Sequence, residues 1–208
     1  MTGHTFDKRF YTPRAFLRDA AYLALHLPDM VSAIIGKRVS RAFAEKVMLA
    51  VTEVNSCRYC SYVHTRMALR HGVSARDIQE LTGWGIAAPA APTYERVALA
   101  FARHFAETEG HSDPQAVRRL RTYYGPAVSR DVLCYIRLIT VGNLAGNSVD
   151  AFLSRLFGKP ARASNPVSEL VMFLLFAPFT LPLLRLMKSS EFATQSAIDL
   201  HDFSIRRR

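Results

Sequence analysis

The stretch from Glu45 to His64 reads EKVMLAVTEVNSCRYCSYVH, and the rest of the chain is best understood as the body that supports it. It contains two cysteines, Cys57 and Cys60, three positions apart. His64 follows the second cysteine by four positions, and Glu45 precedes the first by twelve. Apolar residues at helical spacing lead up to a polar step at 55–56. The stretch therefore predicts two helices joined by a short break, with Asn55 or Ser56 capping the second.

Helical periodicity extends over most of the chain, and no set of alternating strands bounded by turns stands out. The predicted fold class is therefore all-α, a bundle of helices. Glycine and proline interrupt the pattern at 83–92, where we expect a loop. We expect helices over residues 13–25, 29–35, 41–54, 57–70, 75–81, 93–108, 114–124 and 129–157.

Length, composition and charge narrow the class of protein. A chain of 208 residues can bury a core without disulfides, and its 50% hydrophobic content argues against disorder. The net charge of +10 would suit nucleic acid or an anionic membrane surface. The basic residues are nevertheless scattered and form no nucleic-acid-binding signature, so we expect a solvated basic surface and no nucleic-acid partner. No secretory signal precedes the first predicted helix, which predicts a cytoplasmic location.

The C-terminal region contains an uncharged run, LVMFLLFAPFTLPLL, at residues 170–184. Its fifteen residues fall short of the ~20 that a membrane-spanning helix needs, and Pro178 and Pro182 should interrupt it. We expect a core element or an oligomer interface, with membrane-surface contact by residues 170–187 as the less favoured alternative. The predicted organisation is a helical domain at 1–160, which contains the CxxC motif, and an apolar helical extension at 161–208.

The predicted position of the two cysteines near a helix N-terminus favours the reactive form of their thiols. Near a helix N-terminus, unpaired backbone N–H groups stabilise thiolates, the reactive form of cysteine. At ~100° per residue, Cys57, Cys60 and His64 share one helix face. His64 can accept a proton from Cys60 directly or through one water, because imidazole titrates near neutrality. Glu45 can orient that imidazole only if the two helices pack antiparallel.

Other interpretations of these residues are also compatible with the sequence. A zinc site could use Cys57, Cys60 and His64 with Glu45 as the fourth ligand, although no second CxxC or HxxxH half is present. The cysteines could also be a buried structural pair, or a redox switch on a non-catalytic partner- or membrane-binding module. Cys134, far from the pair in sequence, is most simply a small buried hydrophobic residue.

The combination of Glu45, Cys57-Arg-Tyr-Cys60 and His64 resembles the E-x11-C-x2-C-x3-H motif of the AhpD-like alkylhydroperoxidases, within the carboxymuconolactone decarboxylase superfamily. The match covers about twenty residues closely, and the helix order through Gly85 looks similar. One departure is Tyr59, where some members carry a histidine. The decarboxylase branch usually lacks the CxxC pair, so the resemblance points to thiol chemistry and not to lactone decarboxylation.

The resemblance implies an enzyme that reduces hydroperoxides as a homo-oligomer, a trimer or larger, without metal or flavin. It implies that Glu45 and His64 relay a proton from Cys60, which attacks the peroxide and becomes a sulfenic acid. Cys57 then resolves this acid as a Cys57–Cys60 disulfide. A dithiol or protein reductant would restore the two thiols.

Overall fold

The structure, a computed structural model, describes residues 6–82, 93–161 and 164–205, with backbone only from residue 190 onward. The described residues form helices, and their β pairing is limited to an isolated bridge between Phe6 and Ala161. The predicted all-α class is confirmed, whereas the loop expected at 83–92 lies outside the described residues. The helices are α1 (Pro13–Leu25), α2 (Leu27–Ile35), α3 (Arg41–Asn55), α4 (Arg58–Arg70), α5 (Ala75–Thr82), α6 (Thr93–Glu107), α7 (Pro114–Leu156) and α8 (Pro166–Ile205).

Several helix starts follow the capping residues that the sequence predicts. The Ser40 hydroxyl accepts a hydrogen bond from the Phe43 backbone N–H at 3.2 Å and begins α3. The Ser74 hydroxyl accepts from the Asp77 N–H at 3.0 Å and begins α5. These bonds satisfy backbone donors that a helix start would otherwise leave unpaired. The α3 cap fixes where the helix that carries Glu45 begins.

The break between α3 and α4 differs in detail from the prediction. Asn55 is the last residue of α3, and Ser56 closes that helix in the left-handed conformation, with φ 53° and ψ 39°. A left-handed residue ends a helix and turns the chain, so the capping position falls one residue later. Cys57, and not Asn55 or Ser56, is therefore the N-cap of α4.

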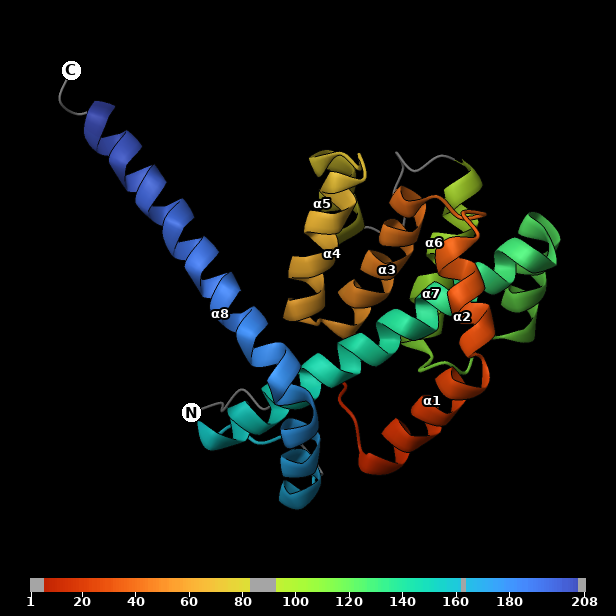
Figure 1. The fold of residues 1–208 in the computed structure, drawn as a ribbon, viewed down its shortest axis with the longest axis horizontal. Coiled ribbons are helices and arrows are strands. Elements are labelled where there is room, and N and C mark those ends of the chain that lie inside the picture. The colour runs from red at the N-terminus through yellow and green to blue at the C-terminus, as the bar shows by residue number, and fades with distance from the viewer. Residues whose placement is uncertain (1–5, 83–92, 162–163, 206–208) are drawn as a thin grey trace.

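Helix α3 lies at the centre of the body, between α4 and α5 on one side and α6 and α7 on the other (Figure 1). Its apolar residues are buried on both sides, which is the reason that nearly the whole helix is excluded from water. The main core combines α3 with α2, α6 and α7, and a smaller cluster forms beneath α4 and α5. Buried side chains of this size contribute about 1.5–3 kcal/mol each. Helix α3 is thus a rigid support for any side chain that it presents to α4.

Helix α7 consists of two helical parts joined at Gly125, which has φ 75° and ψ 169°. The sequence predicts two helices here, but with the second beginning near Ser129. Ser129 instead lies inside the second part, where its hydroxyl donates to the Leu120 carbonyl at 3.0 Å. Glycine accepts the positive φ at the break, and Pro126 follows as a favourable first residue of the second part.

Helix α8 continues through Pro178 and Pro182, so the predicted interruption is wrong. A proline removes a backbone hydrogen bond and bends a helix, but packing and the remaining bonds can carry the helix past it. The first part of α8 packs against the body, with Met172 beside Tyr11 and Leu144. The rest projects away from the body (Figure 1).

Two helices in the described residues are long and apolar enough to cross a membrane, judged by length and composition alone. One is α7, whose most apolar window is 61% buried inside the protein, as a core helix would be. The other is the Pro166–Ser189 part of α8, which has a mean hydropathy of 2.0 and is 17% buried. This part is longer than the fifteen-residue uncharged run because the helix extends beyond it at both ends.

Candidate thiol site

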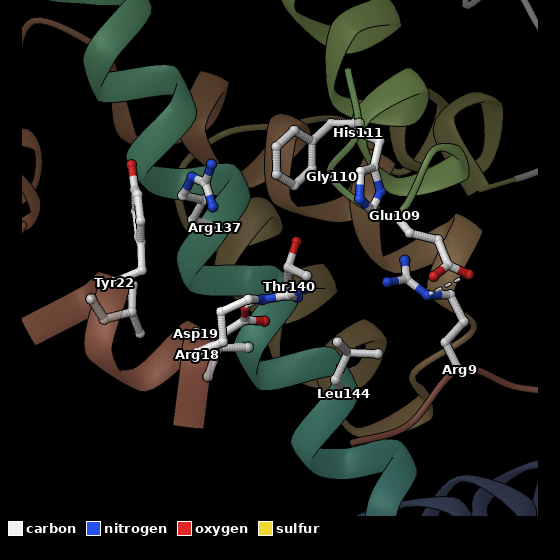
Figure 2. A pocket seen from close by; sticks show the side chains of 13 residues that line it. Arg9, Arg18, Asp19, Tyr22, Glu109, Gly110, His111, Arg137, Thr140 and Leu144 are labelled. Carbon is white, nitrogen blue, oxygen red and sulfur yellow. Dashed lines mark hydrogen bonds and ion pairs between the residues drawn. The ribbon is translucent and has the colours of Figure 1, made fainter. Parts of the chain in front are cut away.

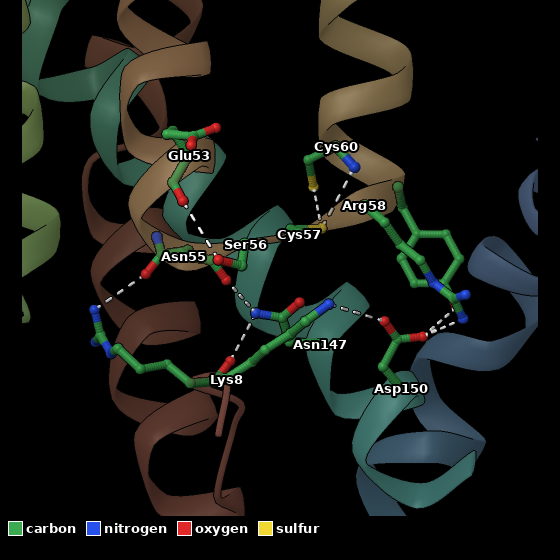
Figure 3. A network of polar contacts seen from close by, with 11 residues as sticks. Lys8, Glu53, Asn55, Ser56, Cys57, Arg58, Cys60, Asn147 and Asp150 are labelled. Atoms are coloured by element: carbon green, nitrogen blue, oxygen red, sulfur yellow. Dashed lines mark hydrogen bonds and ion pairs between the residues drawn. The ribbon is translucent and has the colours of Figure 1, made fainter. Parts of the chain in front are cut away.

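The two cysteines lie together at the start of α4. As the N-cap, Cys57 accepts the Cys60 backbone N–H on its sulfur at 3.4 Å. The two Sγ atoms are 2.9 Å apart, and both thiols are free (Figure 3). A disulfide has an S–S length of about 2.05 Å, so oxidation requires the sulfurs to approach by roughly 0.9 Å. The reduced pair is therefore already close to the geometry of a disulfide.

The two thiols share one hydrogen bond, and this bond makes them unequal. When Cys57 is ionised, the Cys60 S–H donates to its thiolate, which lowers the pKa of Cys57 despite the opposing effect of burial, and the backbone N–H of Cys60 adds to the lowering. The same bond raises the pKa of Cys60, and burial raises it further. In this conformation, negative charge is therefore favoured on Cys57, with the remaining proton on Cys60.

Glu45 and His64 form a second pair beside the cysteines. The Glu45 Oε2 atom lies 2.7 Å from the His64 Nδ1 atom, and the Glu45 side chain is almost completely buried. Packing of α3 against α4 produces this contact. From the sequence, the contact could be stated only as a condition that a Glu45–His64 relay must meet. Among the described residues, His64 makes no hydrogen bond to Cys57 or Cys60. The structure thus brings the four predicted residues together as two bonded pairs.

Helix α7 provides the wall against which the sulfurs pack. A Cβ atom built on Gly146 would lie 2.9 Å from both the Cys57 Sγ and the Tyr59 Cδ2 atoms. A Cβ atom on Gly142 would lie 3.7 Å from the Cys60 Sγ atom, an ordinary contact distance. The absence of a side chain at Gly146 is therefore what allows the start of α4 to approach α7 this closely.

Asp150 anchors the start of α4 one turn further along α7. Its Oδ1 atom accepts hydrogen bonds from the Tyr59 hydroxyl at 2.7 Å and from Arg58 at 2.5 Å. Lys8 forms an ion pair with its Oδ2 atom at 3.7 Å (Figure 3). Burial and the neighbouring carboxylate raise the pKa of Tyr59, so its hydroxyl remains a donor. This network holds Arg58 and Tyr59, the two residues that follow Cys57, in place.

This contribution of α7 was not predicted from the sequence. Gly142, Gly146 and Asp150 are spaced four apart, so they lie on one face of α7, and this spacing was a usable signal. Asn147 adds to the same support, since its Nδ2 atom donates to the backbone carbonyls of Asn55 at 2.7 Å and Arg9 at 2.8 Å. Neither the partner helix nor the N-terminal segment could be identified from local periodicity.

A cavity of about 260 Å³ opens beside Cys57. Its other lining residues are Leu49, Thr52, Glu53, Ser56, Arg58, Ser61 and Thr82. Cys60 is not among the described residues that line it, although Cys60 is itself partly exposed. Across the described residues, no three histidine, cysteine or acidic side chains are grouped as a metal site would require. The arrangement can accordingly pass a proton between the two thiols, and the pair can give two electrons to an oxidant as it closes to a disulfide beside this small cavity.

Comparison with known proteins finds a match to one protein family. The model of the carboxymuconolactone decarboxylase family matches residues 22–104. No curated protein and no solved structure matches the sequence. The matched segment runs from α1 to α6 and includes both bonded pairs. Residues 22–104 are thus similar to the carboxymuconolactone decarboxylase family, and this segment holds Glu45, Cys57, Cys60 and His64.

Proposed function

We propose that the protein is a cytoplasmic thiol peroxidase that reduces hydroperoxides through a reversible Cys57–Cys60 disulfide. The observation that carries the proposal is the 2.9 Å separation of the two free sulfurs, which form a single hydrogen-bonded pair. A structural pair of cysteines would gain nothing from a shared proton. A redox-active pair does benefit from the shared proton, because the proton can pass from one sulfur to the other as the negative charge changes place between them.

In the first step, Cys60 attacks the terminal oxygen of a hydroperoxide. The Cys60 proton passes to the Cys57 thiolate along the existing hydrogen bond. A bond forms between the Cys60 sulfur and oxygen, the O–O bond breaks, and the alkoxide leaves as an alcohol after it receives a proton. The sulfur is oxidised to a sulfenic acid and the peroxide is reduced. The cavity beside Cys57 gives a small peroxide a route to the pair.

In the second step, the Cys57 thiol condenses with the Cys60 sulfenic acid. The S–S bond forms and water leaves, so no further oxidant is needed. An external dithiol or a protein that carries one then reduces the disulfide by thiol exchange. Because the reduced sulfurs already lie close together, this condensation needs only local movement at the first turn of α4.

The Glu45–His64 pair acts as the proton reservoir for these steps. Glu45 bonds the Nδ1 atom, which fixes the orientation of the ring and leaves the Nε2 atom to exchange protons with water or with the reacting groups. Since His64 has no direct hydrogen bond to a cysteine among the described residues, the exchange runs through a bound water or through the substrate. No metal or flavin enters this scheme.

The test is turnover of a hydroperoxide with dithiothreitol as the reductant. We expect activity in the wild type and in Cys134→Ala, and loss of activity in Cys60→Ser and Cys57→Ser. Trapping with dimedone should detect a sulfenic acid at Cys60 in Cys57→Ser, where resolution is blocked. Equal turnover in the wild type and in Cys60→Ser would rule the proposal out.

A second candidate function is a binding module in which the cysteines act as a redox switch. The observation that favours it is α8, whose apolar Pro166–Ser189 part is mostly exposed in the single chain. Either a second copy of the chain or a membrane surface could cover this helix. Sedimentation and liposome flotation, with and without reductant, separate these cases. A peroxidase homo-oligomer should sediment as a trimer or larger and should stay unbound to liposomes in both conditions.

A further inference from the structure

A second cavity, of about 220 Å³, lies on the other face of α7 from the cysteines. At ~100° per residue, Arg137, Val141 and Leu144 point to one side of α7. Gly142 and Gly146 point roughly 160° away from them, toward the sulfurs. The cavity is bounded by α1, by the end of α6 and by this side of α7 (Figure 2). It is therefore separate from the thiol site and has no part in the chemistry proposed above.

Arg137 is the distinctive residue of this cavity. Its guanidinium carbon lies 3.9 Å from the centroid of the Tyr22 ring and 5.4 Å from that of Phe105. Throughout the part of the chain that the structure describes, this guanidinium has no hydrogen bond and no ion pair. Stacking on an aromatic ring occupies the face of a guanidinium but leaves its N–H groups, which lie in the plane, free to donate. A partly buried cation with unused donors thus faces the cavity.

The acidic groups of the cavity are already neutralised by other partners. Asp19 pairs with Arg18 at 2.9 Å and accepts the Tyr11 hydroxyl at 3.0 Å. Glu109 pairs with Arg9 at 3.4 Å. Arg137 therefore remains as the cation that no carboxylate of the cavity balances. His111 also lines the cavity, and its side chain carries no negative charge that could balance Arg137.

The remaining walls of the cavity determine the size and polarity of the ligand that it can hold. Leu23, Val141 and Leu144 are apolar, and the rings of Tyr22 and Phe105 continue this apolar surface. The volume is below the roughly 300 Å³ at which pockets for drug-sized ligands begin, so only a compact molecule fits. A bare phosphate ion would leave the apolar walls uncovered and would meet a single unpaired guanidinium, which favours a carboxylate on an apolar body over phosphate.

We propose that this cavity binds a small organic carboxylate, with its two oxygens on Arg137 and its apolar part between Tyr22, Phe105 and Leu144. An in-plane guanidinium and a carboxylate match each other as a bidentate pair. The inference does not depend on the proposed peroxidase function, since none of Glu45, Cys57, Cys60 and His64 lines the cavity.

The experiment uses benzoate as the probe, with benzamide and inorganic phosphate as comparison probes, and measures binding by saturation-transfer NMR and calorimetry. We expect benzoate to bind the wild type and to bind Arg137→Gln at least tenfold more weakly. Neutral benzamide should bind weakly or not at all. The matched control is Arg130→Gln, which removes an equal charge from the same helix at a half-exposed site paired with Asp29. It should bind benzoate as the wild type does.

Two further measurements keep the test decisive. Circular dichroism establishes that Arg137→Gln is folded, and Arg137→Lys, which keeps the charge but loses the bidentate geometry, should give intermediate affinity. Absence of benzoate binding to the wild type, or equal binding by Arg137→Gln, would overturn the proposal. Binding of phosphate without binding of benzoate would overturn the ligand class.

Discussion

Glu45 on α3 and His64 on α4 are joined at 2.7 Å although 19 positions separate them in the sequence. The carboxylate is almost completely buried, so its hydrogen-bonding capacity is directed to the imidazole and not to water. Such a pair fixes the tautomer and the orientation of the ring, as carboxylates do beside catalytic histidines. It is the contact on which a proton-relay role for His64 depends.

Replacement of Glu45 by Gln should therefore slow the reaction of the cysteine pair. The amide keeps the size of the side chain but loses the negative charge that stabilises a protonated His64. We expect iodoacetamide to alkylate the cysteine pair more slowly near neutral pH, and hydroperoxide turnover to fall by about 10- to 100-fold, as for loss of a general acid–base group. The measurement is the rate against pH. An unchanged pH profile would contradict the relay.

The hydrogen bond between the two thiols can be tested at Cys60. Because this bond lowers the pKa of Cys57, Cys57 should stay a thiolate to lower pH than an ordinary cysteine. Cys60→Ala removes the donor, so the pH midpoint for alkylation of Cys57 should rise and the rate at pH 7 should fall. Cys60→Ser is the matched control, since its hydroxyl can still donate and the midpoint should rise less. Identical midpoints in the two variants would mean that the S–H group does not stabilise the thiolate.

Gly146 and Gly142 form a matched pair for testing the approach of α4 to α7. Gly146→Ala places a methyl group 2.9 Å from the Cys57 sulfur, so we expect a loss of about 1–3 kcal/mol in the free energy of unfolding and slower disulfide formation. Gly142→Ala meets Cys60 at an ordinary 3.7 Å and should be neutral or stabilising by up to about 1 kcal/mol. Urea unfolding and the rate of oxidation by diamide measure both effects. Equal stability of the two variants would show that the close approach of α4 to α7 at Gly146 does not require a glycine.

Glu169 should make the attachment of α8 depend on pH. Burial would raise the pKa of this carboxyl, but hydrogen bonds from Arg155 and Ser164 outweigh burial and lower it. A lowered pKa in the folded state stabilises the protein above the ordinary value near 4.5 and loses this effect as the pH falls through the folded-state pKa. Glu169→Gln should therefore cost about 1–3 kcal/mol at pH 7, and the cost should shrink on acidification below that value.

Urea unfolding at several pH values measures this difference. Glu80→Gln is the control, because Glu80 pairs on a helix surface with the exposed Arg76 and such pairs contribute about 0.5 kcal/mol or less. A difference between the wild type and Glu169→Gln that stays constant down to pH 3 would contradict the lowered pKa.

Cys134 should behave as a core residue and not as a reactive thiol. It is buried in the main core, and burial raises its pKa to about 11. In a Cys57→Ser/Cys60→Ser double variant, the remaining thiol should not react with Ellman's reagent at pH 8 until the protein is unfolded. Rapid stoichiometric labelling of the native double variant would show that Cys134 is accessible.

Local patterns in the sequence predicted much of the helical framework correctly. Ser40 and Ser74 begin their helices as expected, and Cys57, Cys60 and His64 lie along one helix, with Cys57 at its N-cap. These features depend on interactions within a few residues of each other, which periodicity and capping rules describe. The same rules misplaced the α4 cap by a residue and overestimated the effect of Pro178, because neighbouring turns and packing decide such details.

The sequence by itself determined most of the helices, the caps at Ser40 and Ser74, and the placement of Cys57, Cys60 and His64 along one helix face, since each follows from short-range geometry and residue chemistry. Only the tertiary structure decided that Glu45 meets His64, that Gly146 faces Cys57 and that Asp150 holds Tyr59. These contacts join residues 19, 89 and 91 positions apart, by the numbering of the chain. They depend on which helix faces pack together. Burial of apolar surface drives this packing, but it is not directional, so the local sequence pattern of a helix does not identify the helix that it packs against.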